Sequence, residues 1–217
     1  MLPLNLKLKK ELHRKIAAAQ DTAVRVIYRT FDKAVLHGGT AVWRCYKGNR
    51  FSEDIDMYIP GDLAKIEELF KSLAGEGFTI EKKKIGENSL YSTVLSNRVT
   101  LRIEALFRQY EGTLCDYETV DGNIMTVFSL TPEEFILEKI ETYAKRLKIR
   151  DLYDVFFMLR HVADSEKVVS RLGVLLRGYR KPIDEAELKV LILEGLVPTS
   201  SQMAEYIQTW ARKNTPK

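Results

Sequence analysis

The sequence predicts an α+β protein, with a mixed β-sheet and flanking helices in residues 1–130 and a helical domain in residues 131–217. Three observations support this division. Apolar residues recur at spacings of three and four in residues 5–30 and 62–74, which is the period of a helix that packs along one face. Short apolar runs bounded by Gly, Asn and Asp alternate with these helices, as strands do. From Thr131 onward only the helical spacing continues.

Strands in the first half are marked by short apolar runs that end in turn-forming residues. Val35-Leu36 runs into a Gly-Gly turn, and Ile55–Ile59 ends at Pro60-Gly61. Lys82-Lys83-Lys84 is interpreted as a solvated strand end, with RNA contact as the alternative. The remaining strand candidates are residues 78–81, 90–95, 99–107 and 124–128, separated by Ser-Asn, Glu-Gly and Asp-Gly sequences.

The helical half opens with a clear start signal. Thr131 is a good N-cap, Pro132 suits the first helical position, and Glu133 and Glu134 place negative charge in the first turn. We therefore expect a helix to begin at Pro132 and several helices to fill residues 132–213.

Composition places the chain among ordinary globular proteins. Of its 217 residues, 45% are hydrophobic and 29% are charged, and the formal net charge is +4. This mild basicity permits a nucleic-acid partner without requiring one. No apolar run approaches the roughly 18 residues of a membrane span, and the N-terminus has no signal-peptide pattern. Cys45 and Cys115 lack metal-ligand spacing. We therefore expect a cytoplasmic protein with free thiols and no membrane partner.

The stretch between residues 35 and 60 carries the strongest chemical signal. Gly38-Gly39 follows a short strand and lets the backbone approach a phosphate closely. Asp54 and Asp56 begin the next strand at positions i and i+2, so both carboxylates point to one face, about 6–7 Å apart. Hard divalent cations that hold a nucleoside triphosphate prefer such oxygen ligands. The alternative is a strand that merely exposes an acidic face, and the glycine turn upstream argues against it.

A third carboxylate is expected from a later strand. Glu104 stands between Ile103 and Ala105, and an acidic side chain inside an apolar strand is costly to bury unless it is paired or binds a metal. Such a carboxylate could complete a cation site or orient an attacking hydroxyl. The alternative is an ion pair with Arg102, which precedes Glu104 by two residues and faces the same side.

Together these features resemble the polymerase-beta-like nucleotidyltransferase superfamily, whose pattern is an apolar residue, a Gly-Gly or Gly-Ser turn, a spacer, Asp-x-Asp and a lone acidic residue in a later strand. More narrowly, residues 37–42 (HGGTAV) and 50–56 (RFSEDID) resemble the AbiEii/AbiGii nucleotidyltransferase toxin family. A second block is similar to that family's helical motif: residues 138–140 (EKI), followed by residues 146–154 (RLKIRDLYD). Val42 is a small departure, since many relatives carry leucine there.

The resemblance implies the fold of that superfamily, with a C-terminal helical bundle, and a nucleotide site. The backbone of Gly38 and Gly39 would contact the triphosphate at the positive end of a helix that starts near Thr40. Arg50 and Ser52 would complete this site, with the Ser52 hydroxyl bonded to a phosphate oxygen.

The resemblance also implies the catalytic residues. Asp54, Asp56 and Glu104 would hold magnesium or manganese. From the helical half, Lys139 would reach the phosphates of the NTP substrate. Asp151 would lie near the base or sugar, or would help to orient Lys139.

The second block has a physical logic of its own. Asp151 and Asp154 are three residues apart and share a helix face. The same block contains a run of four cations: Lys145, Arg146, Lys148 and Arg150. A run of cations is usually a solvated face, but beside a nucleotide site it could attract a triphosphate or RNA.

The activity implied by the resemblance is metal-dependent transfer of a nucleoside monophosphate from a triphosphate to an acceptor hydroxyl, with release of pyrophosphate. The resemblance further implies the toxin of a toxin–antitoxin pair, with an antitoxin protein as partner and RNA, in particular the 3′ end of tRNA, as acceptor. Two alternatives stay open: the same chemistry on a small molecule or a protein, and a nucleotide-binding regulator without catalysis. Clustered acids without a metal are electrostatically unfavourable, which argues against the regulator.

Overall fold

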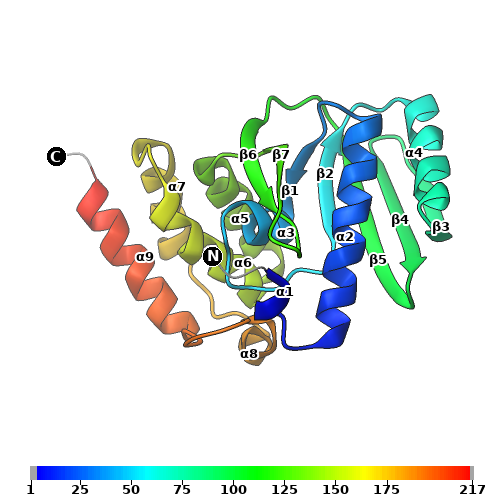
Figure 1. Cartoon of the computed structure of the whole chain (residues 1–217). Coiled ribbons are helices and arrows are strands. Elements are labelled where there is room, and N and C mark those ends of the chain that lie inside the picture. Colours follow the sequence, from blue (N-terminus) through cyan, green and yellow to red (C-terminus); the bar gives the residue numbers. More distant parts are fainter. Residues whose placement is uncertain (1–3, 216–217) are drawn as a thin grey trace. The chain divides into compact units, whose positions relative to one another are not determined.

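The computed structural model describes residues 4–215, which form two compact units, one up to Ser129 and one from Leu130 onward. The first unit contains the sheet, and the second consists of helices (Figure 1).

The first unit is built on a mixed β-sheet, which confirms the predicted fold class. Within residues 4–129, seven strands follow the order β3-β4-β5-β2-β1-β7-β6. β2 is antiparallel to β1 and parallel to β5, and β1 is parallel to β7. The strands are β1 Val35–His37, β2 Ile55–Ile59, β3 Thr79–Ile85, β4 Ser89–Ser96, β5 Val99–Phe107, β6 Thr113–Glu118 and β7 Ile124–Ser129.

Helices of the first unit cover one face of this sheet. α2 (Glu11–Thr30) packs on β5 and beside α4 (Leu63–Gly75) (Figure 1). On β5, Leu101 and Ile103 point to the helices and are each 1% exposed, while Glu104 next to them is only partly buried. This alternation gives the sheet a buried face and a face away from the helices, and Glu104 lies on the latter.

The N-terminal helix is divided, although its periodicity predicted one helix over residues 5–30. α1 (Leu4–Lys7) and α2 (Glu11–Thr30) are separate. Leu8 is fully buried between them, and its carbonyl oxygen accepts a hydrogen bond from Arg14 Nε at 2.6 Å. Because a side chain satisfies this carbonyl in place of a helical N–H, the helix can stop and restart here.

The strand β6 was not predicted. It lies at the sheet edge and pairs antiparallel with β7, with Tyr117 opposite Met125. Tyr117 and Cys115 face inward, but Leu114 is 63% exposed, so the apolar alternation is weak. An edge strand of this kind is specified by its partner more than by its own composition.

A buried ion pair joins α2, α3 (Gly38–Cys45) and β6. The Arg44 guanidinium contacts the Asp21 carboxylate, and neither side chain is more than 5% exposed. Tyr117 Oη donates to Asp21 Oδ1 at 3.0 Å, and the Val120 N–H donates to Oδ2 at 2.8 Å. Burial raises the pKa of Asp21, although Arg44 and these donors act to lower it. A buried carboxylate with several partners holds its elements in one arrangement.

The second unit is helical, and its first helix begins as predicted. The Thr131 side chain accepts from the Glu134 N–H, and the Glu134 carboxylate accepts from the Thr131 N–H at 2.8 Å, with Pro132 next to this capping box. The helices are α5 Pro132–Arg146, α6 Ile149–Met158, η1 Leu159–His161, α7 Glu166–Arg177, η2 Glu185–Glu187, α8 Leu188–Leu191 and α9 Ser200–Asn214.

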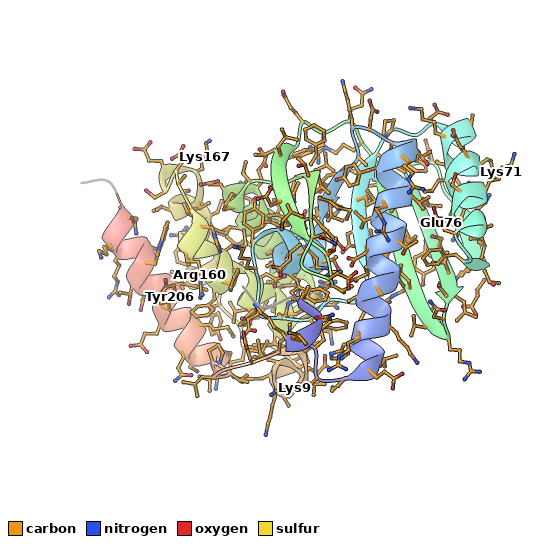
Figure 2. The ribbon with its side chains drawn as sticks, in the orientation of Figure 1. Lys9, Lys71, Glu76, Arg160, Lys167 and Tyr206 are labelled. Carbon is orange, nitrogen blue, oxygen red and sulfur yellow. The ribbon has the colours of Figure 1, made fainter. Side chains whose placement is uncertain are left out.

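Aromatic contacts join α6 to α9 in this unit. The Phe156 ring of α6 lies 5.0 Å from the Tyr206 ring of α9. The guanidinium of Arg160, in η1, lies 4.4 Å from the Phe157 ring of α6. Figure 2 labels Tyr206 and Arg160. Such pairs add to the stability that apolar burial supplies.

Residues 4–215 contain neither a membrane-spanning helix nor a disulfide bond. None of the helices between residues 4 and 215 combines the length and the hydropathy of a membrane span. Cys45 and Cys115 are both free thiols, as expected.

Glu133 links the start of α5 to the segment before α7. Its carboxylate accepts from the backbone N–H groups of Ala163 at 2.8 Å and Asp164 at 2.9 Å. Burial raises the pKa of this carboxyl, but the backbone donors and Lys167 outweigh that effect and hold the pKa below its ordinary value of 4.5. A lowered pKa stabilises the fold above the unfolded pKa, and this stabilisation is lost as pH falls through the folded pKa.

We expect Glu133→Gln to lower the free energy of unfolding by about 1–2 kcal/mol near neutral pH, because the charged acceptor of two backbone N–H groups is lost. The difference from the unsubstituted protein decreases below about pH 4. Urea unfolding at neutral and acidic pH measures both. Glu141→Gln, which removes an exposed carboxylate from the same helix, is the control, and an equal loss for Glu133→Gln at both pH values would contradict the assignment.

Candidate active site

The glycine turn after β1 lies directly against the second predicted acid. Gly38 has a φ of 70°, where glycine is favoured. A Cβ on Gly38 would overlap the Asp56 carboxylate and lie 2.7 Å from its Cγ. A Cβ on Gly39 would lie 2.5 Å from Arg50 Nη2 and 2.6 Å from Ser52 Oγ. Only glycine at both positions allows the turn to touch these side chains.

Register places Asp56 and Glu104 side by side. Asp56 of β2 stands opposite Glu104 of β5 and, on its other side, opposite His37 of β1. Residues in register on neighbouring strands point to the same face, about 4.8 Å apart between strands. Asp54 precedes Asp56 by two residues. Asp56 and Glu104 therefore lie side by side on the sheet face away from the helices, and Asp54 lies just before the start of β2.

Arg102 binds Asp54 in a bidentate ion pair. Its Nε lies 2.7 Å from Oδ1, and its Nη2 lies 2.8 Å from Oδ2. Burial lowers the pKa of Arg102, but Asp54 and Glu104 together raise it above its ordinary value. Arg102 therefore faces the same side as Glu104, as the alternative interpretation required, but its bidentate partner is Asp54.

A pocket of about 370 Å³ lies beside Asp56 and Glu104. In the part of the chain that the structure describes, no group of three or more His, Cys, Asp or Glu side chains is arranged to hold a metal, and the Asp54 carboxylate faces Arg102. The donor chemistry still suits a hard divalent cation, because Asp56 and Glu104 offer carboxylate oxygens from adjacent strands. The pocket is lined by His37, Asp56, Ser89, Leu90, Tyr91, Glu104, Ala105 and Leu106.

Two buried polar side chains anchor the segment that carries the acids. The Thr40 hydroxyl donates to the Asp54 carbonyl oxygen. Gln20 Nε2 donates to the Ser52 carbonyl oxygen at 2.9 Å and to Thr40 Oγ1 at 3.3 Å. Thr40, predicted to lie at the nucleotide, therefore contacts the backbone behind the acids. Gln20 was not predicted, although a polar residue inside the apolar stripe of a helix is a detectable signal.

In the helical unit, Lys139 belongs to a buried network of charges. Its Nζ lies 3.3 Å from Asp154 Oδ2 and 3.9 Å from Asp151 Oδ1. Arg146 donates to both oxygens of Asp151 at 2.7 and 2.8 Å. Lys139 is 5% exposed, and both aspartates are fully buried. Asp151 thus contacts Lys139, which is one of the two roles suggested for it. Asp154, predicted to share a helix face with Asp151, and Arg146 of the basic run belong to the same network.

Ion pairs within the unit engage part of the basic run. Arg146 is bound to Asp151, and Lys148 Nζ lies 3.3 Å from Asp184 Oδ2. Lys145 is exposed and Arg150 is half-buried. The positive charge that the run can offer to a polyanion is therefore smaller than its composition suggests.

Comparison with protein families identifies the family of this chain. A family model described as "Nucleotidyl transferase AbiEii toxin, Type IV TA system" matches residues 24–208. The chain belongs to the AbiEii nucleotidyltransferase toxin family. The match includes the glycine turn, the acids and the helical block, so the expected family is confirmed. As a member of the AbiEii family, the protein is a nucleotidyltransferase.

Solved structures agree with the fold of this family. MenT4, a nucleotidyltransferase toxin from Mycobacterium tuberculosis H37Rv, matches with a TM-score of 0.66 at 19% identity, over 96% of this chain and 90% of that chain. JHP933 from Helicobacter pylori matches with a TM-score of 0.65 at 20% identity, over 94% of each chain. At these identities the likeness concerns the fold alone. A sequence comparison with curated proteins gives no significant match.

The glycine turn generates a first prediction for this AbiEii protein. We expect Gly38→Ala to reduce the initial rate of nucleotide transfer by at least about 100-fold, because the new Cβ displaces the Asp56 carboxylate and a shift of this size disrupts a catalytic geometry. Strain at positive φ lowers stability by only about 1–2 kcal/mol. Gly75→Ala is the control, since a Cβ there meets nothing within 4 Å. An active Gly38→Ala variant would remove the turn from the site.

The charge network generates a second prediction. We expect Lys139→Met to lower the free energy of unfolding by roughly 3 kcal/mol, because it removes the cation that pairs with the buried Asp154 carboxylate, while Arg146 still binds Asp151. Adding Asp154→Asn restores the charge balance and part of the stability, as thermal unfolding will show. If Lys139 also binds phosphate, the restored double variant stays inactive in nucleotide transfer. Recovery of activity together with stability would give Lys139 a purely structural role.

Proposed function

We propose that this nucleotidyltransferase transfers a nucleoside monophosphate from a triphosphate to a hydroxyl of RNA, with the 3′ end of tRNA as the leading acceptor. The observation that carries the proposal is the packing of Gly38 directly on Asp56, with Glu104 in register on the next strand. A turn able to approach phosphate and a pair of adjacent carboxylates meet at one point, as this chemistry requires.

The donor triphosphate lies against the turn in this proposal. The backbone N–H groups of Gly38 and Gly39 open α3, and the start of a helix favours anions. Ser52 and Arg50 stand beside Gly39, where a hydroxyl and a guanidinium can bind phosphate oxygens. The site therefore holds the triphosphate on the β1 side of Asp56.

Carboxylates at the centre supply the catalytic groups. Asp56, Glu104 and an Asp54 released from Arg102 would hold magnesium or manganese, which when bound neutralises charge on the triphosphate. Glu104 accepts the proton of the acceptor hydroxyl. The acceptor oxygen then bonds to the α-phosphorus, and the bond from that phosphorus to the departing pyrophosphate breaks. Lys139 is kept as a candidate phosphate ligand, a role that the double variant Lys139→Met and Asp154→Asn tests.

The acceptor and the partners follow from the family and the charge. Membership of a toxin family of a toxin–antitoxin system supports a cognate antitoxin protein. A net charge of +4 is compatible with a polyanionic acceptor. Triphosphates and RNA occur together in the cytoplasm, where we place the reaction.

Mass-resolved transfer tests the proposal. Purified protein is incubated with each common ribonucleoside triphosphate and with separate pools of total RNA, protein and small aminoglycosides. We expect an added nucleotide on RNA, with tRNA as the labelled species. Label confined to the protein or the small-molecule pool would reject the RNA acceptor, and tight triphosphate binding without transfer to any pool would favour a regulator.

The central acids give a sharper prediction. We expect Asp56→Asn to reduce transfer by about 100-fold or more, because the side chain that packs against the glycine turn and would bind the cation loses its charge. Removal of divalent cations by a chelator has the same effect on the unsubstituted enzyme, and magnesium restores activity. Stability changes little or rises slightly, since adjacent like charges are reduced. Asp116→Asn, on the edge strand β6, is the matched control. Activity of Asp56→Asn at the unsubstituted rate would reject the assigned site.

A further inference from the structure

A row of side chains crosses the sheet from the central acids to its edge. Register aligns Lys84 of β3 with Tyr91 of β4, Tyr91 with Glu104 of β5, and Glu104 with Asp56 of β2. All point to the face away from the helices, because aligned residues share a face. Lys84 therefore lies about 14 Å from Asp56 along the row, on the side opposite to β1 and the glycine turn.

A second row runs beside the first. Lys82 aligns with Thr93, and Thr93 aligns with Arg102. Lys83 between the two rows points the other way, where its Nζ lies 2.6 Å from Glu67 of α4. Successive residues of β3 thus point to opposite faces of the sheet. Lys83 pairs with a helix, whereas Lys82 and Lys84 lie on the face that no helix of the described first unit covers.

The side chains of the two rows have the chemistry of a nucleic-acid surface. Lys82 and Lys84 are exposed, and the Lys82 Nζ lies 4.9 Å from the centre of the Tyr91 ring. A cation and an aromatic ring are therefore placed together, as a phosphate and its base require. Glu81 is an acidic residue at the bulge of β3, and it lies farther from the row that contains Glu104 than Lys82 does. Tyr91 also lines the pocket that contains Asp56 and Glu104.

We infer that the exposed face of β3, β4 and β5 binds the acceptor as a single strand of RNA, with Tyr91 as a base-stacking platform and with Lys82 and Lys84 bound to phosphates. This face is termed the acceptor face. It is continuous with the pocket beside Glu104, and it approaches Asp56 from the side that the donor triphosphate leaves open. Stacking on a ring beside lysines tolerates any base, so the acceptor face binds single strands without reading a sequence.

The inference rests on the proposed transfer to RNA, and the experiment separates the two. Binding is measured first, without triphosphate, by fluorescence anisotropy of a labelled single-stranded oligoribonucleotide of roughly twelve nucleotides. We expect Lys84→Glu to weaken binding about tenfold at low salt and to reduce the slope of log affinity against log salt by about 0.7. Lys71→Glu makes the same charge change on α4, on the opposite face (Figure 2), and stays within about twofold.

Tyr91 is tested by a matched pair. Tyr91→Leu removes the ring and is expected to weaken binding roughly tenfold, whereas Tyr91→Phe keeps the ring and stays within about twofold. Steady-state kinetics of the transfer reaction then distinguish an effect on the RNA acceptor from an effect on the triphosphate. The KM for the RNA acceptor rises in Lys84→Glu and Tyr91→Leu, while the KM for the triphosphate is unchanged.

Each outcome has one meaning. Transfer to RNA with unchanged acceptor KM and oligonucleotide affinity in Lys84→Glu and Tyr91→Leu overturns the acceptor face and leaves the proposed function standing. Specific loss of oligonucleotide binding in these variants supports the acceptor face even if transfer to RNA is not detected. The acceptor face is overturned if the unsubstituted protein does not bind the oligonucleotide. It is also overturned if Lys84→Glu and Tyr91→Leu lose only the transfer to a protein acceptor.

Discussion

The close approach of Gly38 to Asp56 is the constraint on which the rest of the site depends. No side chain fits between the turn and the carboxylate, so the start of α3 and the start of β2 can meet only because residue 38 is glycine. Register carries the position of Asp56 across to Glu104. Gln20 and Thr40 then hold the intervening segment from behind. The turn proposed to bind phosphate thereby lies beside two carboxylates that are far apart in sequence.

Some charged groups are buried in ion pairs and others are exposed to solvent, and the two kinds have different roles. Asp21 with Arg44 in the first unit, and Lys139 with Asp154 in the second, are buried ion pairs with partners inside their own unit. Such groups bind their neighbours and specify one packing arrangement. The lysines of the acceptor face are exposed instead, so their charge acts on the solvent side. Arg102 is intermediate, because it is bound to Asp54 at the centre of the proposed reaction.

Much of the fold was predictable because local signals agreed with the tertiary arrangement. The capping sequence at Thr131 and the period of residues 62–74 corresponded to α5 and α4. The failures were places where a hydrogen bond outside the regular pattern of the segment decided the outcome. A side chain bonded to the Leu8 carbonyl divides the first helix, and pairing with β7 makes a strand of residues 113–118. The first effect involves Arg14, six residues farther along the same segment, and the second involves a partner strand, so apolar periodicity predicts neither.

The sequence by itself determined the chemical groups: the paired glycines, the Asp-x-Asp spacing, Glu104 and the lysine of the helical block. These could be recognised because the chemistry restricts residue types and local spacing. Only the tertiary structure decided which groups meet. It bound Arg102 to Asp54 rather than to its near neighbour, buried Lys139 between two aspartates, and aligned Lys84 and Tyr91 with the acids. The physical reason is that register and burial are set by partners distant in the chain, and a spacing along one segment carries no information about them.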